Sequence, residues 1–101
     1  MRLRACSLAD IPEDRGHEVL VAGRVVGLFR QDGGVVAVDG LCPHAGGPLA
    51  TGYCRDGVVM CPWHGWQFSL ATGEHCSTPQ ITVERFDCEV DGDDVFVTID
   101  D

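Results

Sequence analysis

The stretch "GLCPHAGGPLA" (residues 40–50) and the later stretch "MCPWHGWQF" (residues 60–68) each place a Cys and a His within four positions. The first pair has the spacing C-x-H and the second C-x-x-H, and sixteen residues separate the two pairs. Each pair fits within one loop, so two loops are able to converge on one metal centre. Thiolate and imidazole suit zinc or an iron–sulfur cluster. The four candidate ligands are Cys42, His44, Cys61 and His64.

The surroundings of these pairs help to choose between the two metals. Two Cys and two His make a normal zinc set, but zinc fingers usually pair Cys with Cys and His with His, and they carry a helix. Here each loop mixes the two, and glycines at 46, 47, 52 and 65 let backbone N–H groups approach a centre closely. Such donors suit sulfides that gain negative charge on reduction. An iron–sulfur cluster is therefore favoured, with a zinc-stapled structural module as the alternative.

The flanking sequence predicts strands. Short apolar, β-branched runs occur throughout, and turn signals such as "QDGG" (residues 31–34) and "DGDD" (residues 91–94) separate several of them. Residues 7–14 have room for one helical turn at most. We predict an all-β fold, with an antiparallel sandwich or barrel as its base. The predicted strands are 18–22, 24–30, 35–38, 57–60, 66–70, 81–90 and 95–99.

Length and charge limit the partners. The 101 residues predict a single domain, 1–101, in which the Gly- and Cys-rich part from about 41 to 79 is a subdomain inserted into the β base. Seven Lys and Arg against sixteen Asp and Glu give a formal charge of −9, which argues against nucleic acid and anionic membranes as partners. The first sixteen residues lack the apolar core of a signal peptide, so a cytoplasmic location is expected.

The paired motifs closely resemble those of the Rieske family. The resemblance covers essentially the whole chain, including a third loop with a proline, "STPQ" (residues 77–80). It implies the Rieske fold and one [2Fe–2S] cluster, with Cys42 and Cys61 on one iron and His44 and His64 on the other. The residues expected to surround the cluster in its loops are Gly46, Gly47, Trp63, Gly65, Trp66 and Pro79.

The same resemblance predicts a low reduction potential. High-potential members carry a disulfide between two further Cys, and Ser and Tyr after the second His; the matching positions here are Gly47, Trp63, Trp66 and Phe68. Without those hydrogen-bond donors the reduced state is less stabilised. We expect a potential near the low end of the family range, about −150 mV.

The remaining Cys and His residues are expected to have structural roles. Cys54 and Cys76 flank the second loop and are predicted to be free or buried thiols, although extra ligands or a disulfide remain open. Cys6 and Cys88 are predicted to be core residues. His17 and His75 have no Cys at the motif spacing and are not expected to be ligands. The Trp residues, Trp63 and Trp66, are expected to pack around the cluster, and Trp63 is also a candidate docking residue.

Three functions fit these features. The first is an electron-carrier ferredoxin, not itself an enzyme, that passes single electrons from a flavin-containing, NAD(P)H-oxidising reductase to a terminal oxygenase. An oxygenase needs a second iron site with two His and a carboxylate, and only two His remain, His17 and His75. The second is the Rieske small subunit of an assimilatory NAD(P)H nitrite reductase, because the motifs resemble that protein as well. The third is the zinc-stapled module.

Overall fold

The structure is a computed structural model that describes residues 1–43 and 45–99. It consists of strands and two short 3-10 helices, and no described helix is long and apolar enough to cross a membrane. In chain order the elements are β1 (Arg2–Ser7), η1 (Leu8–Asp10), β2 (His17–Val21), β3 (Arg24–Gln31), β4 (Gly34–Asp39), η2 (Leu49–Thr51), β5 (Tyr53–Arg55), β6 (Val58–Met60), β7 (Gln67–Ser69), β8 (Arg85–Asp91) and β9 (Asp94–Thr98).

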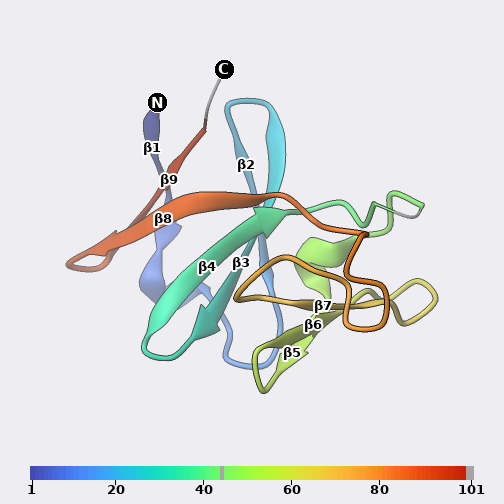
Figure 1. Cartoon of the computed structure of the whole chain (residues 1–101). Coiled ribbons are helices and arrows are strands. Elements are labelled where there is room, and N and C mark those ends of the chain that lie inside the picture. The colour runs from blue at the N-terminus through green and yellow to red at the C-terminus, as the bar shows by residue number, and fades with distance from the viewer. Residues whose placement is uncertain (44, 100–101) are drawn as a thin grey trace.

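Six of the strands form one antiparallel sheet, the base, in the order β1-β9-β8-β4-β3-β2 (Figure 1). The strands at the two ends of this order, β1 and β2, also contact each other, so the sheet curls into a near-barrel. Its interior holds a cluster of buried apolar side chains from β1, β2, β3, β4 and β9. These include Cys6, Val26, Leu28, Ala37 and Val97. The prediction of an all-β barrel base is confirmed.

Strand β3 is buried on both of its faces. Val26 and Leu28 point into the barrel, whereas Phe29 belongs to a second buried cluster on the opposite face. This explains why "VVGLF" (residues 25–29) is a continuous apolar run and does not alternate with polar residues. β3 is therefore a wall shared by the barrel and by the part of the chain that carries the Cys–His pairs.

A second, three-stranded sheet of β5, β6 and β7 lies against that outer face (Figure 1). The helix η2 packs closely on the base, next to this sheet. A Cβ added at Gly27 of β3 would lie only 2.8 Å from the Cα of Ala50, so the two backbones are in close contact. The segment before β2 adds hydrogen bonds: Gly16 N–H donates to Gly52 O at 3.0 Å, and Cys54 N–H donates to Asp14 O at 2.9 Å. The base thus fixes the position of the smaller sheet, while the boundaries 41–79 remain a prediction.

Most predicted strands are present, with three differences. β1 and β5 were not predicted. β1 carries Arg at alternate positions and pairs with β9, more than eighty residues later, and β5 has only three residues. Residues 81–84 are not part of β8, because their backbone bonds to the segment that follows β7 of the smaller sheet. Val83 N–H donates to Gly73 O at 2.7 Å, and His75 N–H donates to Ile81 O at 2.8 Å. The single helical turn expected within 7–14 is η1.

Candidate metal centre

The two Cys–His loops share one backbone hydrogen-bond pattern. In the first loop Gly46 N–H donates to Cys42 O, and Cys42 N–H donates to Gly47 O, both at 2.8 Å. In the second, Gly65 N–H donates to Cys61 O at 3.2 Å and Cys61 N–H donates to Trp66 O at 2.7 Å. Each loop therefore starts at its Cys and turns through a glycine four positions later. Gly46 and Gly65 have φ of 70° and 71°, in the left-handed region that favours glycine.

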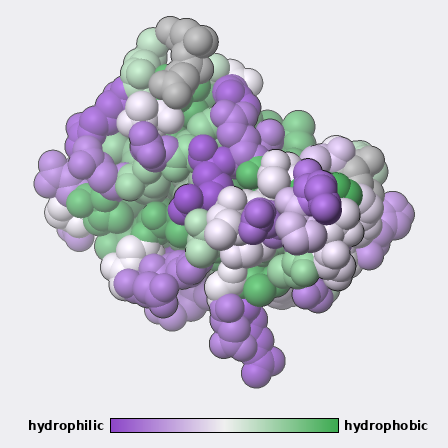
Figure 2. Space-filling view, in the orientation of Figure 1, coloured by the Kyte–Doolittle hydropathy of each residue, from purple (hydrophilic) through white to green (hydrophobic). Residues whose placement is uncertain are grey.

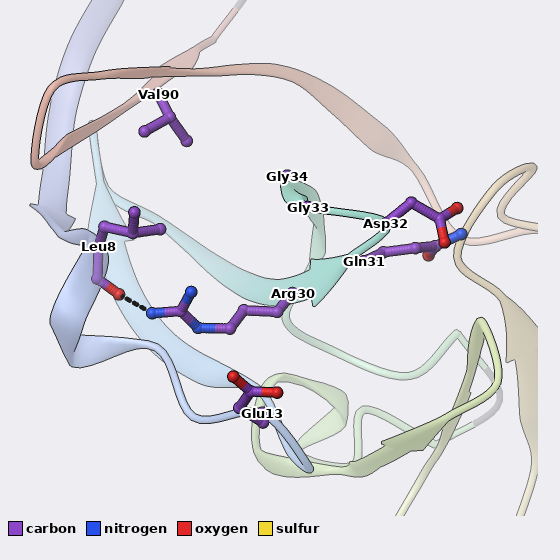
Figure 3. Close-up of a pocket in the computed structure, with 8 residues that line it drawn as sticks. All are labelled: Leu8, Glu13, Arg30, Gln31, Asp32, Gly33, Gly34 and Val90. Carbon is purple, nitrogen blue, oxygen red and sulfur yellow. Dashed lines mark hydrogen bonds between the residues drawn. The ribbon is translucent and has the colours of Figure 1, made fainter.

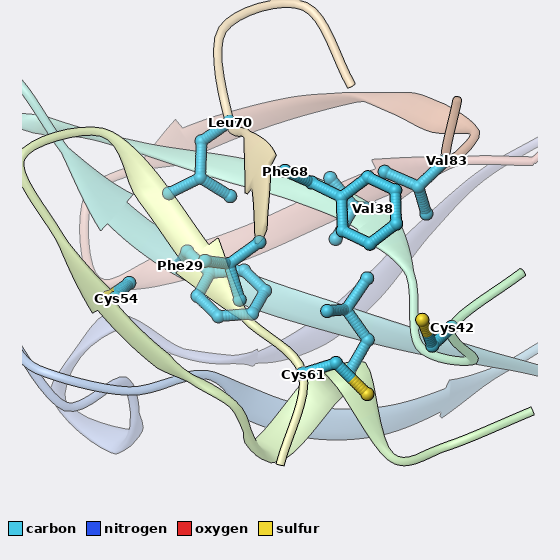
Figure 4. Packing of buried hydrophobic residues seen from close by; sticks show 10 residues of the cluster. Phe29, Val38, Cys42, Cys54, Cys61, Phe68, Leu70 and Val83 are labelled. Atoms are coloured by element: carbon cyan, nitrogen blue, oxygen red, sulfur yellow. The ribbon is translucent and has the colours of Figure 1, made fainter. Parts of the chain in front are cut away.

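The loops also contact each other. A Cβ at Gly47, in the first loop, would lie 3.0 Å from Sγ of Cys61 and 3.1 Å from Cγ of Trp63, both in the second loop. The Cys42 and Cys61 side chains are buried at one edge of the second apolar cluster and come from separate chain segments (Figure 4). The fold thus brings two buried sulfurs and two close-packed glycine loops to one place, as a thiolate-held centre requires.

His64 completes the second pair and has an unusual backbone. Its φ is 68°, although it is not a glycine, and it is exposed to solvent. Left-handed non-glycine residues cost free energy and gather at functional sites. His44, the histidine of the first pair, lies outside the described residues. The structure therefore describes three of the four expected ligands.

A third loop, residues 76–80, lies near the second, because Cys76 N–H donates to Gln67 O at 2.9 Å, and it contains Pro79, which is exposed. His75 holds this loop, because its Nδ1 accepts hydrogen bonds from the N–H groups of Ser77, at 3.1 Å, and Thr78, at 3.0 Å. Its ring also packs edge-on against Trp66, with centroids 4.9 Å apart, and Phe68, at 5.3 Å. This structural role, which the sequence analysis did not foresee, is consistent with the prediction that His75 is not a ligand.

The four cysteines outside the two Cys–His pairs form no disulfide. Cys54 and Cys76 are both free thiols, Cys54 buried and Cys76 exposed. Cys54 donates to Glu13 O at 3.6 Å, and burial, with a smaller contribution from Asp14, raises its pKa, so it is held as a neutral thiol. Burial, then the nearby Cys6 and Glu89, raises the pKa of Cys88 to about 11. No disulfide joins Cys54 and Cys76, and Cys6 lies in the barrel core as predicted, whereas Cys88 is only half-buried and packs against that core.

The surface around the three loops is poor in charge. Between residues 41 and 83 the only Asp, Glu, Lys or Arg residues are Arg55, Asp56 and Glu74. The first two form the β5–β6 turn, which projects as a hydrophilic arm at the bottom of Figure 2, away from the loops on the right of Figure 1. Large apolar side chains are exposed instead, with Leu41 at 48% and Trp63 at 50%. That backbone N–H groups of Gly46, Gly47 and Gly65 approach the centre remains a prediction, whereas Gly52 packs against the carbonyl groups of Met60 and Leu49.

Comparison with known proteins decides the family. Residues 1–91 match the family described as the Rieske [2Fe-2S] domain. The chain belongs to the Rieske family. The Rieske cofactor is a [2Fe–2S] cluster, and the buried cysteine pair and the glycine loops fit it. The iron–sulfur interpretation is therefore confirmed, and the zinc-stapled alternative for these loops is not supported.

Two curated relatives illustrate the range of proteins that carry this Rieske domain. The 3-phenylpropionate/cinnamic acid dioxygenase ferredoxin subunit of Escherichia coli is 30% identical over 97% of this chain and 93% of its own length. Human apoptosis-inducing factor 3 is 31% identical over 91% of this chain, which spans only 15% of that protein.

Three solved structures share the fold. The ferredoxin of Sphingomonas yanoikuyae B1 superimposes with a TM-score of 0.87 at 26% identity, over 99% of this chain and 100% of its own. The putative NADH-dependent nitrite reductase small subunit of Mycobacterium tuberculosis has a TM-score of 0.85 at 28% identity, over 96% and 93%. A complex of reduced oxygenase and oxidised ferredoxin of carbazole 1,9a-dioxygenase gives a TM-score of 0.82 at 26% identity, over 95% and 91%.

Proposed function

We propose that this Rieske protein is a one-electron carrier of the cytoplasm, which passes electrons from an NAD(P)H-dependent flavin reductase to a terminal oxygenase. The observation that carries the proposal is the pair of matched loops, which bury two Cys sulfurs and expose His64. Similarity to ferredoxin components of oxygenase systems over nearly the whole chain supports it. When bound, the cluster supplies a centre that takes up and releases one electron.

Within this proposal, Cys42, His44, Cys61 and His64 are the cluster ligands. The buried cysteines exclude water from the sulfur side, while His64 lies on the solvent side, where a partner can approach. The assignment of His44 rests on the motif spacing. The loop residues Gly46, Gly47, Gly65, Trp63, Trp66 and Pro79 shape the centre and its rim.

The proposed partners follow from chemistry and surface. An uncharged rim with Leu41 and Trp63 exposed suits a small, transient contact, which is typical of electron-transfer partners. The formal charge of −9 disfavours nucleic acid and anionic membranes. A low potential, about −150 mV, matches electrons that come from NAD(P)H through a flavin.

A second function is favoured by a specific observation. The likeness to a nitrite reductase small subunit is as high as that to several ferredoxins. Such a subunit would remain bound to a large chain that carries flavin and sirohaem. A free carrier would exchange between two partners.

Electron transfer in a reconstituted system tests the proposal. The cluster-loaded protein should show a Rieske EPR signal on reduction and a midpoint near the low end of the family range in voltammetry. An NAD(P)H-dependent, flavin-containing ferredoxin reductase should reduce it. The terminal oxygenase that works with that reductase should reoxidise it under single-turnover conditions. Stable co-purification with a sirohaem-containing chain would favour the nitrite reductase function instead. A midpoint well above zero would contradict a carrier for NAD(P)H-derived electrons.

A further inference from the structure

A second group of ligand side chains lies outside the cluster loops. The thiol of Cys6, the carboxylate of Asp10 and the imidazole of His17 each offer one ligand atom, and all three atoms lie within 4.8 Å of one another. Cys6 is buried, His17 half-buried and Asp10 exposed. A soft sulfur, a borderline imidazole nitrogen and a hard carboxylate oxygen therefore lie close together. Solvent reaches this group from the side of the exposed Asp10.

These three residues bridge the seam of the barrel. Cys6 lies on β1 just after a bulge, Asp10 ends η1, and His17 begins β2. In the ladders formed by the described residues, β1 pairs with β9 and β2 pairs with β3, so the two strands contact each other without forming a ladder. An ion held by Cys6 and His17 would join the strands at the place where the sheet itself does not.

The connection between the strands is fixed in place. Arg30 of β3 donates from Nε to Ile11 O at 2.7 Å. It also donates from Nη2 to Leu8 O at 2.6 Å (Figure 3). Ser7 N–H donates to Oδ2 of Asp10 at 3.2 Å, so one of the two carboxylate oxygens of Asp10 already accepts a hydrogen bond. The backbone that carries Asp10 is thus ordered before any ion binds, which lowers the cost of binding.

The spacing of the donors suits an ion of zinc size. Among the described residues no hydrogen bond or ion pair joins the three side chains to one another. A tetrahedral zinc ion, with bonds of about 2.0–2.3 Å, holds its ligand atoms roughly 3.3–3.8 Å apart. The donor atoms lie within 4.8 Å of one another, so they need to close in by at most about 1.5 Å, through rotation of the exposed Asp10 side chain and of the His17 ring.

We propose that Cys6, Asp10 and His17 form a Zn²⁺ site that staples β1 to β2, separate from the Rieske centre. Thiolate and imidazole favour zinc over the hard cations Mg²⁺ and Ca²⁺. Three protein ligands leave the fourth position to water, and the thiol proton is released to solvent when the ion binds. The thiolate and the carboxylate together neutralise the charge of the ion.

Calorimetric titration of the cluster-loaded, oxidised protein with ZnCl₂ tests the site, while visible absorption reports on the cluster. The expected result is one zinc per chain with unchanged absorption. Because loss of a second-shell partner already costs about 10–100-fold in metal affinity, Asp10→Asn and His17→Gln should each weaken zinc at least about tenfold. The matched controls are Asp14→Asn, an exposed carboxylate between η1 and β2, and Cys76→Ser, an exposed thiol, and both should bind zinc as the wild type does.

Thermal unfolding gives a second readout that does not depend on calorimetry. Saturating zinc should raise the Tm of the wild type by at least about 5 °C and that of Asp10→Asn much less. Asp10 is exposed, so this variant is expected to fold even if a change at buried Cys6 does not. The proposal is overturned by absence of zinc binding to the wild type, by unchanged affinity in Asp10→Asn or His17→Gln, or by zinc uptake that bleaches the cluster.

Discussion

Gly47 determines how closely the two cluster loops approach each other. Replacement by Ala would place a methyl group 3.0 Å from the Cys61 sulfur and 3.1 Å from the Trp63 ring, so the loops would have to separate. We expect Gly47→Ala to lower the free energy of unfolding by about 1–3 kcal/mol and to reduce cluster content. Iron analysis and denaturant unfolding measure the two effects.

The control is Gly34→Ala, at the start of β4, where the added Cβ would meet only Gln31 O at 3.7 Å. It should leave both quantities close to those of the wild type. An equal loss in the two variants would show that the Gly47 contact is not what limits the loops.

The ligand assignment is also tested at single residues. Changes of Cys42, His44, Cys61 and His64 to Ala should each abolish the red-brown colour and the EPR signal, because each would remove a proposed bond to iron. Cys54→Ala and Cys76→Ala should keep both, although Cys54→Ala leaves a small cavity in a buried cluster. An unaltered Rieske signal in His44→Ala would refute the ligand set.

The four candidate ligands could be proposed from the sequence because each Cys–His pair is local to one loop, and the assignment itself remains a prediction. The contact of Gly47 with Cys61 could be expected only in general terms, since it depends on how two loops from different segments pack. The Cys6, Asp10 and His17 group could not be predicted, because the curl that brings β1 beside β2 is set by ladders that span almost the whole chain. In the same way, the role of His75 becomes visible only when the third loop folds back over Trp66 and Phe68.

At the scale of elements, the third loop depends on His75. Its Nδ1 accepts two backbone hydrogen bonds, each worth about 0.5–1.5 kcal/mol net, and its ring packs on two aromatic rings. We therefore expect His75→Ala to destabilise the protein by about 1–3 kcal/mol and to speed loss of the cluster in air. Denaturant unfolding and the decay of visible absorption are the measurements.

His75→Asn separates the two contributions. The Asn side chain can accept hydrogen bonds from the N–H groups two and three residues later, as in an Asx turn, but cannot replace the ring contacts. Partial recovery in His75→Asn is expected. If His75→Ala matched the wild type, the loop would be held by other contacts.

At the scale of the whole molecule, acidic residues are sparse in the part of the chain that carries the Cys–His loops. Of the sixteen acidic residues only Asp56 and Glu74 fall between residues 41 and 83, and the other fourteen lie elsewhere in the sequence. The screening length is about 10 Å at 0.1 M salt. We expect the rate of reduction by the partner reductase to fall by less than about threefold between 0.05 and 0.5 M salt, as measured by stopped flow.

A larger effect is expected from the apolar rim. Trp63→Ala should slow reduction more than salt does, with the EPR spectrum used to check that the cluster is intact. Leu20→Ser, at a residue 72% exposed on β2, is the control for an exposed apolar side chain in the base. A steep fall of the rate with salt would instead indicate that the acidic base steers the partner.

Strand β3, with the barrel on one face and the second buried cluster on the other, has a consequence for how the molecule unfolds. Neither half keeps a complete core when the other melts, because Leu28 and Phe29 are adjacent residues of one strand and serve opposite sides. Amide protons along β3 should therefore exchange only through global opening, and bleaching of the visible chromophore on heating should coincide with loss of the far-UV circular dichroism signal in a single cooperative transition. A cluster that bleaches well before the barrel unfolds would show that the two cores are separate units. If the two cores unfold together, the redox centre is lost only when the whole barrel unfolds.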